Sequence, residues 1–92
     1  MNEISELLKN WHFYKGFILS NEDTLAKKIN KLEQIIEKLD TLEREIIKLR
    51  FFHCAEMSYI ASKLYLHRAT LYRKLKKILR KIEYLYQNTV FI

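Results

Sequence analysis

The stretch from Glu56 to Lys81 has the apolar spacing of two helices joined by a tight break, which constrains the fold strongly. Ala61 supplies a small residue at which two helix backbones can approach closely. Aliphatic side chains recur at helical intervals on both sides of the break, at Ile60, Leu64, Leu66, Leu71 and Leu75. The pattern predicts helices over about 56–65 and 68–86 that pack at a steep angle.

The charge is distributed unevenly along the chain. Residues 1–62 hold nine Lys or Arg against ten Asp or Glu, whereas residues 63–92 hold eight against one, and the formal net charge is +6. A cationic segment favours a polyanionic partner, because neutralising phosphates releases condensed counterions. A packed helix pair with a polybasic second member is typical of a helix-turn-helix that binds double-stranded DNA. On charge alone, a solvated face without a partner is the alternative.

The composition predicts an all-α fold of four to five helices with a C-terminal helix-turn-helix unit. The chain has 92 residues, is 49% hydrophobic and 30% charged, and contains no Pro and one Gly. Folds rich in β-structure need more turn residues than that. We expect one compact domain, with an N-terminal helical region over 1–38 and a helix-turn-helix region over 39–92.

Targeting signals and cysteine usage suggest a compartment. No apolar run reaches the roughly 18 residues that a membrane span needs, and no signal-peptide pattern opens the chain. The single cysteine, Cys54, excludes an internal disulfide. We therefore expect a cytoplasmic protein without a membrane partner.

The N-terminal region has two apolar stripes. Ile4, Leu7, Leu8 and Trp11 follow helical spacing within about 4–19. An aromatic cluster then follows, formed by Trp11, Phe13, Tyr14 and Phe17. It can pack in the core or dock a partner protein, because aromatic residues are enriched at interfaces.

A second stripe alternates steps of four and three residues, at Leu25, Ile29, Leu32, Ile36 and Leu39. Ser20 or Asn21 can cap this helix, and Ser20 with Asp23 resembles a capping box. About two heptads indicate an intramolecular seam, since coiled coils are inferred from three or four. A homodimer through this helix remains the alternative.

A third helix is predicted to begin at Asp40-Thr41, where Asp40 and Glu43 form a capping pair, and to end near His53-Cys54. Its buried stripe is expected at Ile46, Leu49 and Phe52.

The segment that contains this helix has a distinctive series of charged, aliphatic and aromatic residues, at Leu39, Glu43, Arg44, Glu45, Ile46, Ile47, Leu49, Arg50 and Phe51. With the helix pair that follows it, this series resembles the C-terminal, −35-reading domain of bacterial sigma factors. The start of the second helix, from His67 to Leu71, also resembles that of PucR-type regulators. The resemblance covers about Leu39 to Ile82 and implies a helix-turn-helix that reads DNA.

Small proteins that join such a domain to a different helical N-terminus are similar to phage late-gene regulators of the ArpU/RinA type. This resemblance implies a transcription regulator from a phage or mobile element, acting in a bacterial host cell. RNA polymerase or another transcription regulator is then an expected partner. The chain lacks a region long enough to melt a promoter, so we do not expect a full initiation factor.

One position departs from the sigma-like pattern. Tyr65 stands in the turn where Gly is usual. A left-handed residue with a side chain costs about 1 kcal/mol, and Tyr is not among the tolerant types. Either the turn adopts a variant geometry or packing absorbs the strain.

The first two turns of the second helix should enter the major groove. Arg68 and Arg73 can each bond a guanine edge, a contact worth about 1–3 kcal/mol of discrimination. Ala69, and alternatively Thr70, can meet a thymine methyl group, and Tyr72 can bond a base edge or a phosphate. The predicted base-reading residues are His67, Arg68, Ala69, Tyr72, Arg73 and Lys76.

Phosphate contacts, which position the protein without specifying a sequence, are predicted at Lys63, Thr70, Lys74, Lys77 and Arg80. For each lysine the alternative is a solvated side chain with no contact. Tyr59, Tyr65 and Tyr72 have an alternative role too, completing the core with their hydroxyls at its rim.

Catalysis finds little support in the sequence. His12, His53 and His67 share no metal-ligand spacing, and Cys54 lies beside His53 without a third group to orient the pair. We expect no enzyme activity, metal or cofactor. The hypothesis is a DNA-binding regulator of transcription, which needs a dimer or tethering partner because one helix-turn-helix contacts few base pairs. The rival is a protein-binding module that engages RNA polymerase or another regulator without reading DNA.

Overall fold

The computed structural model describes residues 3–13 and 24–88, and every regular element in these ranges is a helix. The elements are α1 (Glu3–Lys9), α3 (Thr24–Glu37), α4 (Thr41–Ile47), the π-helix η1 (Lys48–Phe52), α5 (Met57–Lys63) and α6 (Arg68–Asn88). Residues 11–13 are also helical. The all-α prediction is therefore confirmed, and the expected caps at Ser20 and Asn21 lie outside the described residues.

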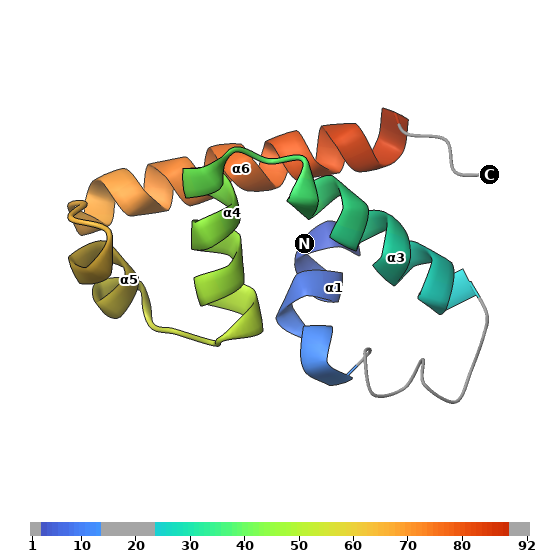
Figure 1. Ribbon diagram of the computed structural model, residues 1–92, viewed down its shortest axis with the longest axis horizontal. Coiled ribbons are helices and arrows are strands. Elements are labelled where there is room, and N and C mark those ends of the chain that lie inside the picture. The colour runs from blue at the N-terminus through green and yellow to red at the C-terminus, as the bar shows by residue number, and fades with distance from the viewer. Residues whose placement is uncertain (1–2, 14–23, 89–92) are drawn as a thin grey trace.

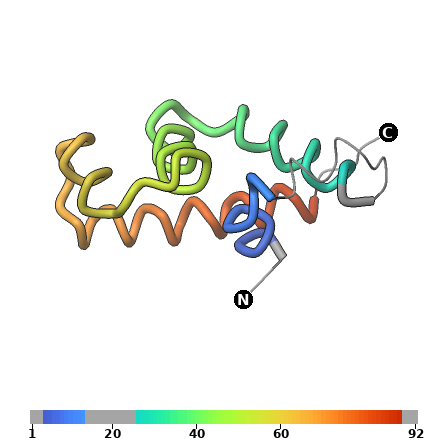
Figure 2. Tube along the Cα trace, turned by 90° about the horizontal axis from the view of Figure 1, so that it is seen from below, coloured from blue at the N-terminus to red at the C-terminus, as the bar shows by residue number. Residues whose placement is uncertain are grey.

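Helix α6 runs along one side of the molecule, and the other α-helices pack along its length. It has 21 residues, which corresponds to about 31 Å at the rise of an α-helix. Residues of α1, α3, α4 and α5 all contact it. Helices α4 and α5 lie over its N-terminal half and α1 and α3 over its C-terminal half (Figure 1). In the perpendicular view, α3, α4 and α5 lie on the same side of α6 (Figure 2).

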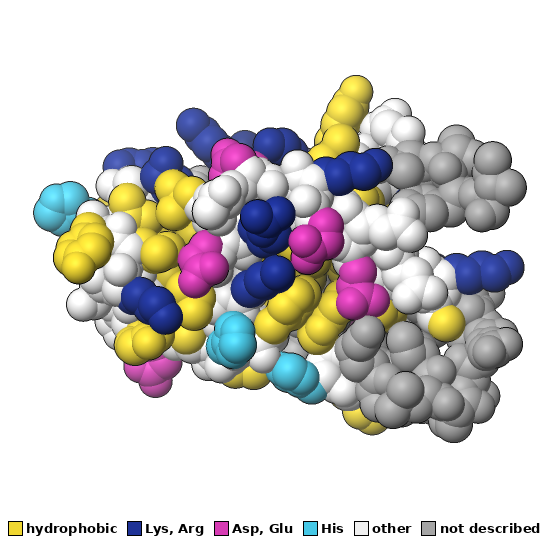
Figure 3. Space-filling view, viewed as in Figure 1, with side chains coloured by type: hydrophobic (Ala, Val, Ile, Leu, Met, Phe, Trp, Pro, Cys, Tyr) yellow, Lys and Arg dark blue, Asp and Glu magenta, His cyan; other side chains and the backbone are white. Residues whose placement is uncertain are grey.

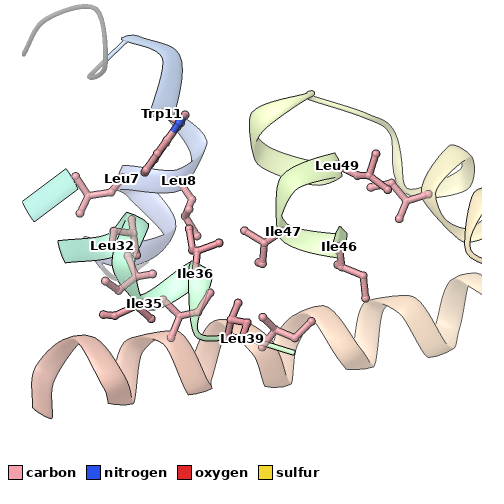
Figure 4. Packing of buried hydrophobic residues seen from close by; sticks show 14 of the residues in the cluster. Leu7, Leu8, Trp11, Leu32, Ile35, Ile36, Leu39, Ile46, Ile47 and Leu49 are labelled. Atoms are coloured by element: carbon pink, nitrogen blue, oxygen red, sulfur yellow. The ribbon is translucent and has the colours of Figure 1, made fainter. Parts of the chain in front are cut away.

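The core is one continuous cluster of buried apolar side chains drawn from all six elements. Leu8, Ile36 and Ile47 come from three different helices and converge (Figure 4), and each is at most 1% exposed. The predicted core positions Ile4, Leu7, Leu8, Leu39, Ile46 and Leu49 are confirmed as buried.

The partner surface expected on the N-terminal helices is largely inside the core. Ile29, Leu32 and Ile36 are at most 1% exposed, because α3 packs against α4 and α6. Trp11 is 5% exposed and stacks on Phe52 with ring centroids 4.6 Å apart. The partner and dimer assignments of these four residues, Trp11, Ile29, Leu32 and Ile36, were therefore wrong.

The remaining residues of that expected surface have a different outcome. Phe13 is 69% exposed and stays on the surface. Tyr14, Phe17 and the side chain of Leu25 lie outside the described part of the chain.

The predicted capping pair at the start of α4 is present. The Glu43 backbone N–H donates to Asp40 Oδ1 at 2.8 Å, and the Asp40 backbone N–H donates to Glu43 Oε1 at 3.2 Å. Two of the backbone donors left unpaired at a helix start are satisfied in this way. The capping box therefore fixes where the chain leaves α3 and enters α4.

Helix α4 continues as the π-helix η1 and ends at the predicted place. The helical conformation does not continue past Cys54, whose φ is 54°. The Ala55 N–H donates to the Leu49 carbonyl at 2.9 Å. Arg50 Nη1 donates to the Ala55 carbonyl at 3.0 Å. These bonds fix the short loop that leads into α5.

The turn between α5 and α6 has the geometry in which glycine is usual, although Tyr65 occupies it. Tyr65 has φ 58°, its N–H donates to the Ser62 carbonyl at 3.3 Å, and the Leu66 N–H donates to the Ala61 carbonyl at 2.8 Å. This is the Schellman pattern of a helix end. The turn therefore does not adopt a variant geometry to accommodate Tyr65. Packing does not absorb the strain either, because the Tyr65 side chain is 96% exposed.

Ile47→Ala should lower the free energy of unfolding by about 2–5 kcal/mol, since it leaves a cavity in the middle of the core. Leu42→Ala is the matched control on the same helix, where the side chain is 39% exposed and the loss should be below about 1 kcal/mol. Urea unfolding measures both. Equal losses would contradict this placement of the core.

Tyr65→Gly should raise the free energy of unfolding by about 1 kcal/mol, because glycine adopts a positive φ without steric cost. Tyr84→Gly provides the control. Tyr84 is also exposed, at 66%, but it lies inside α6, where glycine should destabilise by about 1 kcal/mol. Thermal unfolding of the two variants should therefore shift in opposite directions.

Candidate functional site

The site is built on the packed pair of α5 and α6. Ile60 and Ala61 on α5 and Leu71 on α6 are all buried, at 0%, 4% and 0% exposure. The small side chain of Ala61 lies at the end of α5, where its carbonyl also closes the turn. The predicted helix pair is therefore confirmed, including the start of α6 at Arg68. The turn and the first residues of α6 form one end of the molecule (Figure 1).

All six predicted base-reading side chains are exposed: His67, Arg68, Ala69, Tyr72, Arg73 and Lys76. Tyr72 is 51% exposed. Arg73 Nη2 donates a weak hydrogen bond to Thr70 Oγ1 at 3.4 Å, so this contact holds Arg73 only loosely. Hydrogen-bonding groups on the first two turns of α6 are thus presented to solvent.

The predicted phosphate contacts divide into two groups. Lys63, Lys77 and Arg80 are exposed, whereas Thr70 and Lys74 are half-buried. Lys63 Nζ lies 5.9 Å from the centroid of the Tyr59 ring, within the range of a cation–π interaction. Of the predicted phosphate contacts, Lys63, Lys77 and Arg80 are therefore the most accessible from solvent.

A shallow groove of about 160 Å³ lies between the start of α4 and the middle of α6. Its lining residues are Asp40, Leu42, Glu43, Ile46, Lys74, Lys77 and Ile78. Two carboxylates thus share this groove with Lys74 and Lys77. They lower the local positive potential, so the half-buried Lys74 is a weaker candidate for phosphate than the exposed Lys77 and Arg80.

A cationic stripe lies on the face of α6 opposite the core. At about 100° per residue, Arg73, Lys76, Lys77 and Arg80 project away from the side that carries Leu71, Ile78 and Ile82. No acidic residue interrupts α6 before Glu83. Lys and Arg side chains gather along the edge of the molecule formed by α6 (Figure 3).

Lys81 differs from the stripe residues because it is paired within the chain. Its Nζ lies 2.9 Å from Glu43 Oε1. The hydrogen bond to Glu43 raises the pKa of Lys81 above its usual value of 10.5. This bridge joins α4 to α6 next to the Asp40–Glu43 capping box, so Lys81 supports the fold and its charge is partly neutralised.

Three tyrosines of the helix pair lie on the surface. Tyr59, Tyr65 and Tyr72 are 55%, 96% and 51% exposed, so the alternative that they complete the core was wrong. For two of them the sequence spacing indicated this exposure, since Tyr59 precedes the buried Ile60 and Tyr72 follows the buried Leu71. Tyr59 and Tyr72 therefore each lie about 100° around the helix from a core position.

Within residues 3–13 and 24–88, no group of three or more His, Cys, Asp or Glu side chains could hold a metal ion. Cys54 is exposed, and its Sγ donates to the Phe51 carbonyl at 3.8 Å. In the same ranges no helix is long and apolar enough to cross a membrane.

Comparison with known proteins leaves the sigma-like resemblance untested. No protein-family model, no curated protein and no solved structure matches the chain. The functional argument therefore depends on the geometry and chemistry of the α5–α6 surface.

Lys81→Met should destabilise the protein by removing the bridge to Glu43. Because the pKa of Lys81 is raised in the folded state, its contribution is complete below pH 10.5 and is lost as the pH rises through the folded pKa. The difference in melting temperature between wild type and variant should shrink in that range. Lys76→Met, on the opposite face, is the control; a difference that stays constant with pH would contradict the bridge.

Proposed function

We propose that the protein is a transcription regulator that binds double-stranded DNA through α5, the turn and the first two turns of α6. The observation that carries the proposal is the exposed, cationic outer face of α6 next to a helix-turn-helix turn. Between residues 57 and 82 the sequence has eight Lys or Arg and no Asp or Glu. Such a surface attracts the phosphate backbone of DNA.

The shape of the molecule is compatible with this role. An α-helix with its side chains is about 10–12 Å wide and fits the major groove, which is about 12 Å wide. The first turn of α6 lies at one end of a molecule with dimensions of 40 × 26 × 24 Å. The N-terminal helices pack over the far half of α6 (Figure 1), where they leave its first turns free to enter the groove.

The exposed side chains divide by chemistry. Arg68 and Arg73 suit guanine edges, and Ala69 suits a thymine methyl group. Lys77 and Arg80 lie farther along α6 and would follow the phosphates on one side of the groove.

One helix-turn-helix covers few base pairs, so a second copy or a tethering protein such as RNA polymerase would complete the specificity. A phage or mobile-element regulator acting in the bacterial cytoplasm is the context that the sequence resemblance favours.

A selection from random duplexes, followed by a salt titration of the enriched sequence, tests the proposal. We expect a preferred sequence that binds at least 10³-fold more tightly than a scrambled duplex. Binding to the scrambled duplex should fall steeply with salt, since it depends on counterion release. If no sequence is enriched and affinity equals that of a basic peptide of the same charge, the protein-binding alternative replaces DNA reading.

Arg73→Ala should relax the preference at one base position by about 1–3 kcal/mol, because it removes a bidentate base contact. Its matched control is Lys77→Ala, one turn farther along the same exposed stripe. That variant should weaken all sequences alike and reduce the slope of affinity against salt by about one ion. Binding of both variants to the preferred and single-mismatch duplexes separates the two roles. Equal and uniform losses would contradict the assignment.

A further inference from the structure

The backbone conformation of Tyr65 destabilises the fold, and the Tyr65 side chain makes little packing contact that would offset this. Its backbone is left-handed, with φ 58°, a conformation that disfavours residues with a side chain. Its side chain is 96% exposed, the highest value among the large apolar residues that the structure describes. A strained conformation that no side-chain packing compensates indicates that the residue is kept for an interaction with another molecule.

The position of Tyr65 limits what it can touch. It lies three residues before Arg68, so the chain between them spans at most about 10 Å. The major groove is about 12 Å wide. If Arg68 is inside the groove, Tyr65 must lie near the rim, where the sugar–phosphate backbone runs.

The surroundings of Tyr65 favour an anionic partner. The exposed cations Lys63 and Arg68 flank it in the sequence, and no acidic residue occurs between Met57 and Ile82. A phenol hydroxyl is a good hydrogen-bond donor to phosphate and is found in this role at protein–DNA interfaces.

We propose that Tyr65 is a DNA-contact residue whose hydroxyl donates a hydrogen bond to a backbone phosphate at the rim of the major groove. This inference rests on the proposed function. The side chain holds the helix-turn-helix at a fixed depth while α6 reads the bases. Tyrosine in the turn therefore lowers the stability of the fold but adds a contact with DNA.

Tyr65→Phe and Tyr65→Gly test the contact, with Tyr84→Phe as the matched control. Tyr84 is an exposed tyrosine of the same helix pair, but it lies sixteen residues beyond Arg68, about 24 Å along α6. Affinity for the enriched duplex and for a scrambled duplex is measured by fluorescence anisotropy, and melting temperature by circular dichroism.

We expect Tyr65→Phe and Tyr65→Gly each to weaken binding to both duplexes by about tenfold, because a phosphate contact carries no sequence information. Tyr84→Phe should bind as wild type does. Tyr65→Gly should also melt about 4–8 °C higher than wild type. Weaker binding by a more stable protein cannot be attributed to misfolding.

Three results would overturn the inference. If wild type selects a sequence but both Tyr65 variants bind as it does, the contact is absent and the proposed function stands. If Tyr65→Phe binds normally and only Tyr65→Gly is weakened, the hydroxyl–phosphate bond is wrong. If wild type has no sequence preference and binds only as a basic peptide does, the proposed function itself fails.

Discussion

Burial of one face of α6 is the interaction on which the rest of the structure depends. Leu71, Ile78 and Ile82 on this face are at most 3% exposed. Helices α1, α4 and α5 have seven residues each, and isolated helices of that length are not stable in water. Their stability must come from packing against α6 and one another. The fold is therefore a set of short helices packed on a single long one, and none of the short helices would be stable alone.

Sequence patterns predicted the features that local chemistry decides. Asp40 and Glu43 identified the start of α4 because a capping box acts within four residues, and the apolar period from Leu71 to Ile82 identified α6. Ile35 and Ile47 are at most 2% exposed but were missed, because each adjoins a predicted stripe and a helix packed between two neighbours buries a wider face than one seam suggests. The π-helix η1 could not be predicted, since a shift in backbone hydrogen bonding has no residue signature. DNA reading by α6 stays a prediction.

The two faces of α6 have separate tasks, and the residue types reflect the separation. Aliphatic side chains on the inner face hold the short helices, whereas Arg73, Lys76, Lys77 and Arg80 lie on the opposite face, away from the core. Lys81 lies between these faces and pairs with Glu43 at 2.9 Å. Because the outer residues contribute little burial, substitutions there should leave the fold intact. The inner residues do not have this freedom, and the DNA reading that we propose for α6 depends on this separation.

The unbroken length of α6 has a mechanical consequence. Its C-terminal half packs against α1 and α3, and its N-terminal half against α4 and α5 (Figure 1). A helix of 21 residues without an internal break is stiff, so α4 and α5 would move with it as one body. A tilt of about 5° around the end packed against α1 and α3 displaces the first turn by roughly 3 Å, since the helix is about 31 Å long. That displacement matches the length of one hydrogen bond. Under the proposed function, a protein that docks on the N-terminal helices would therefore change which bases are within reach without touching DNA.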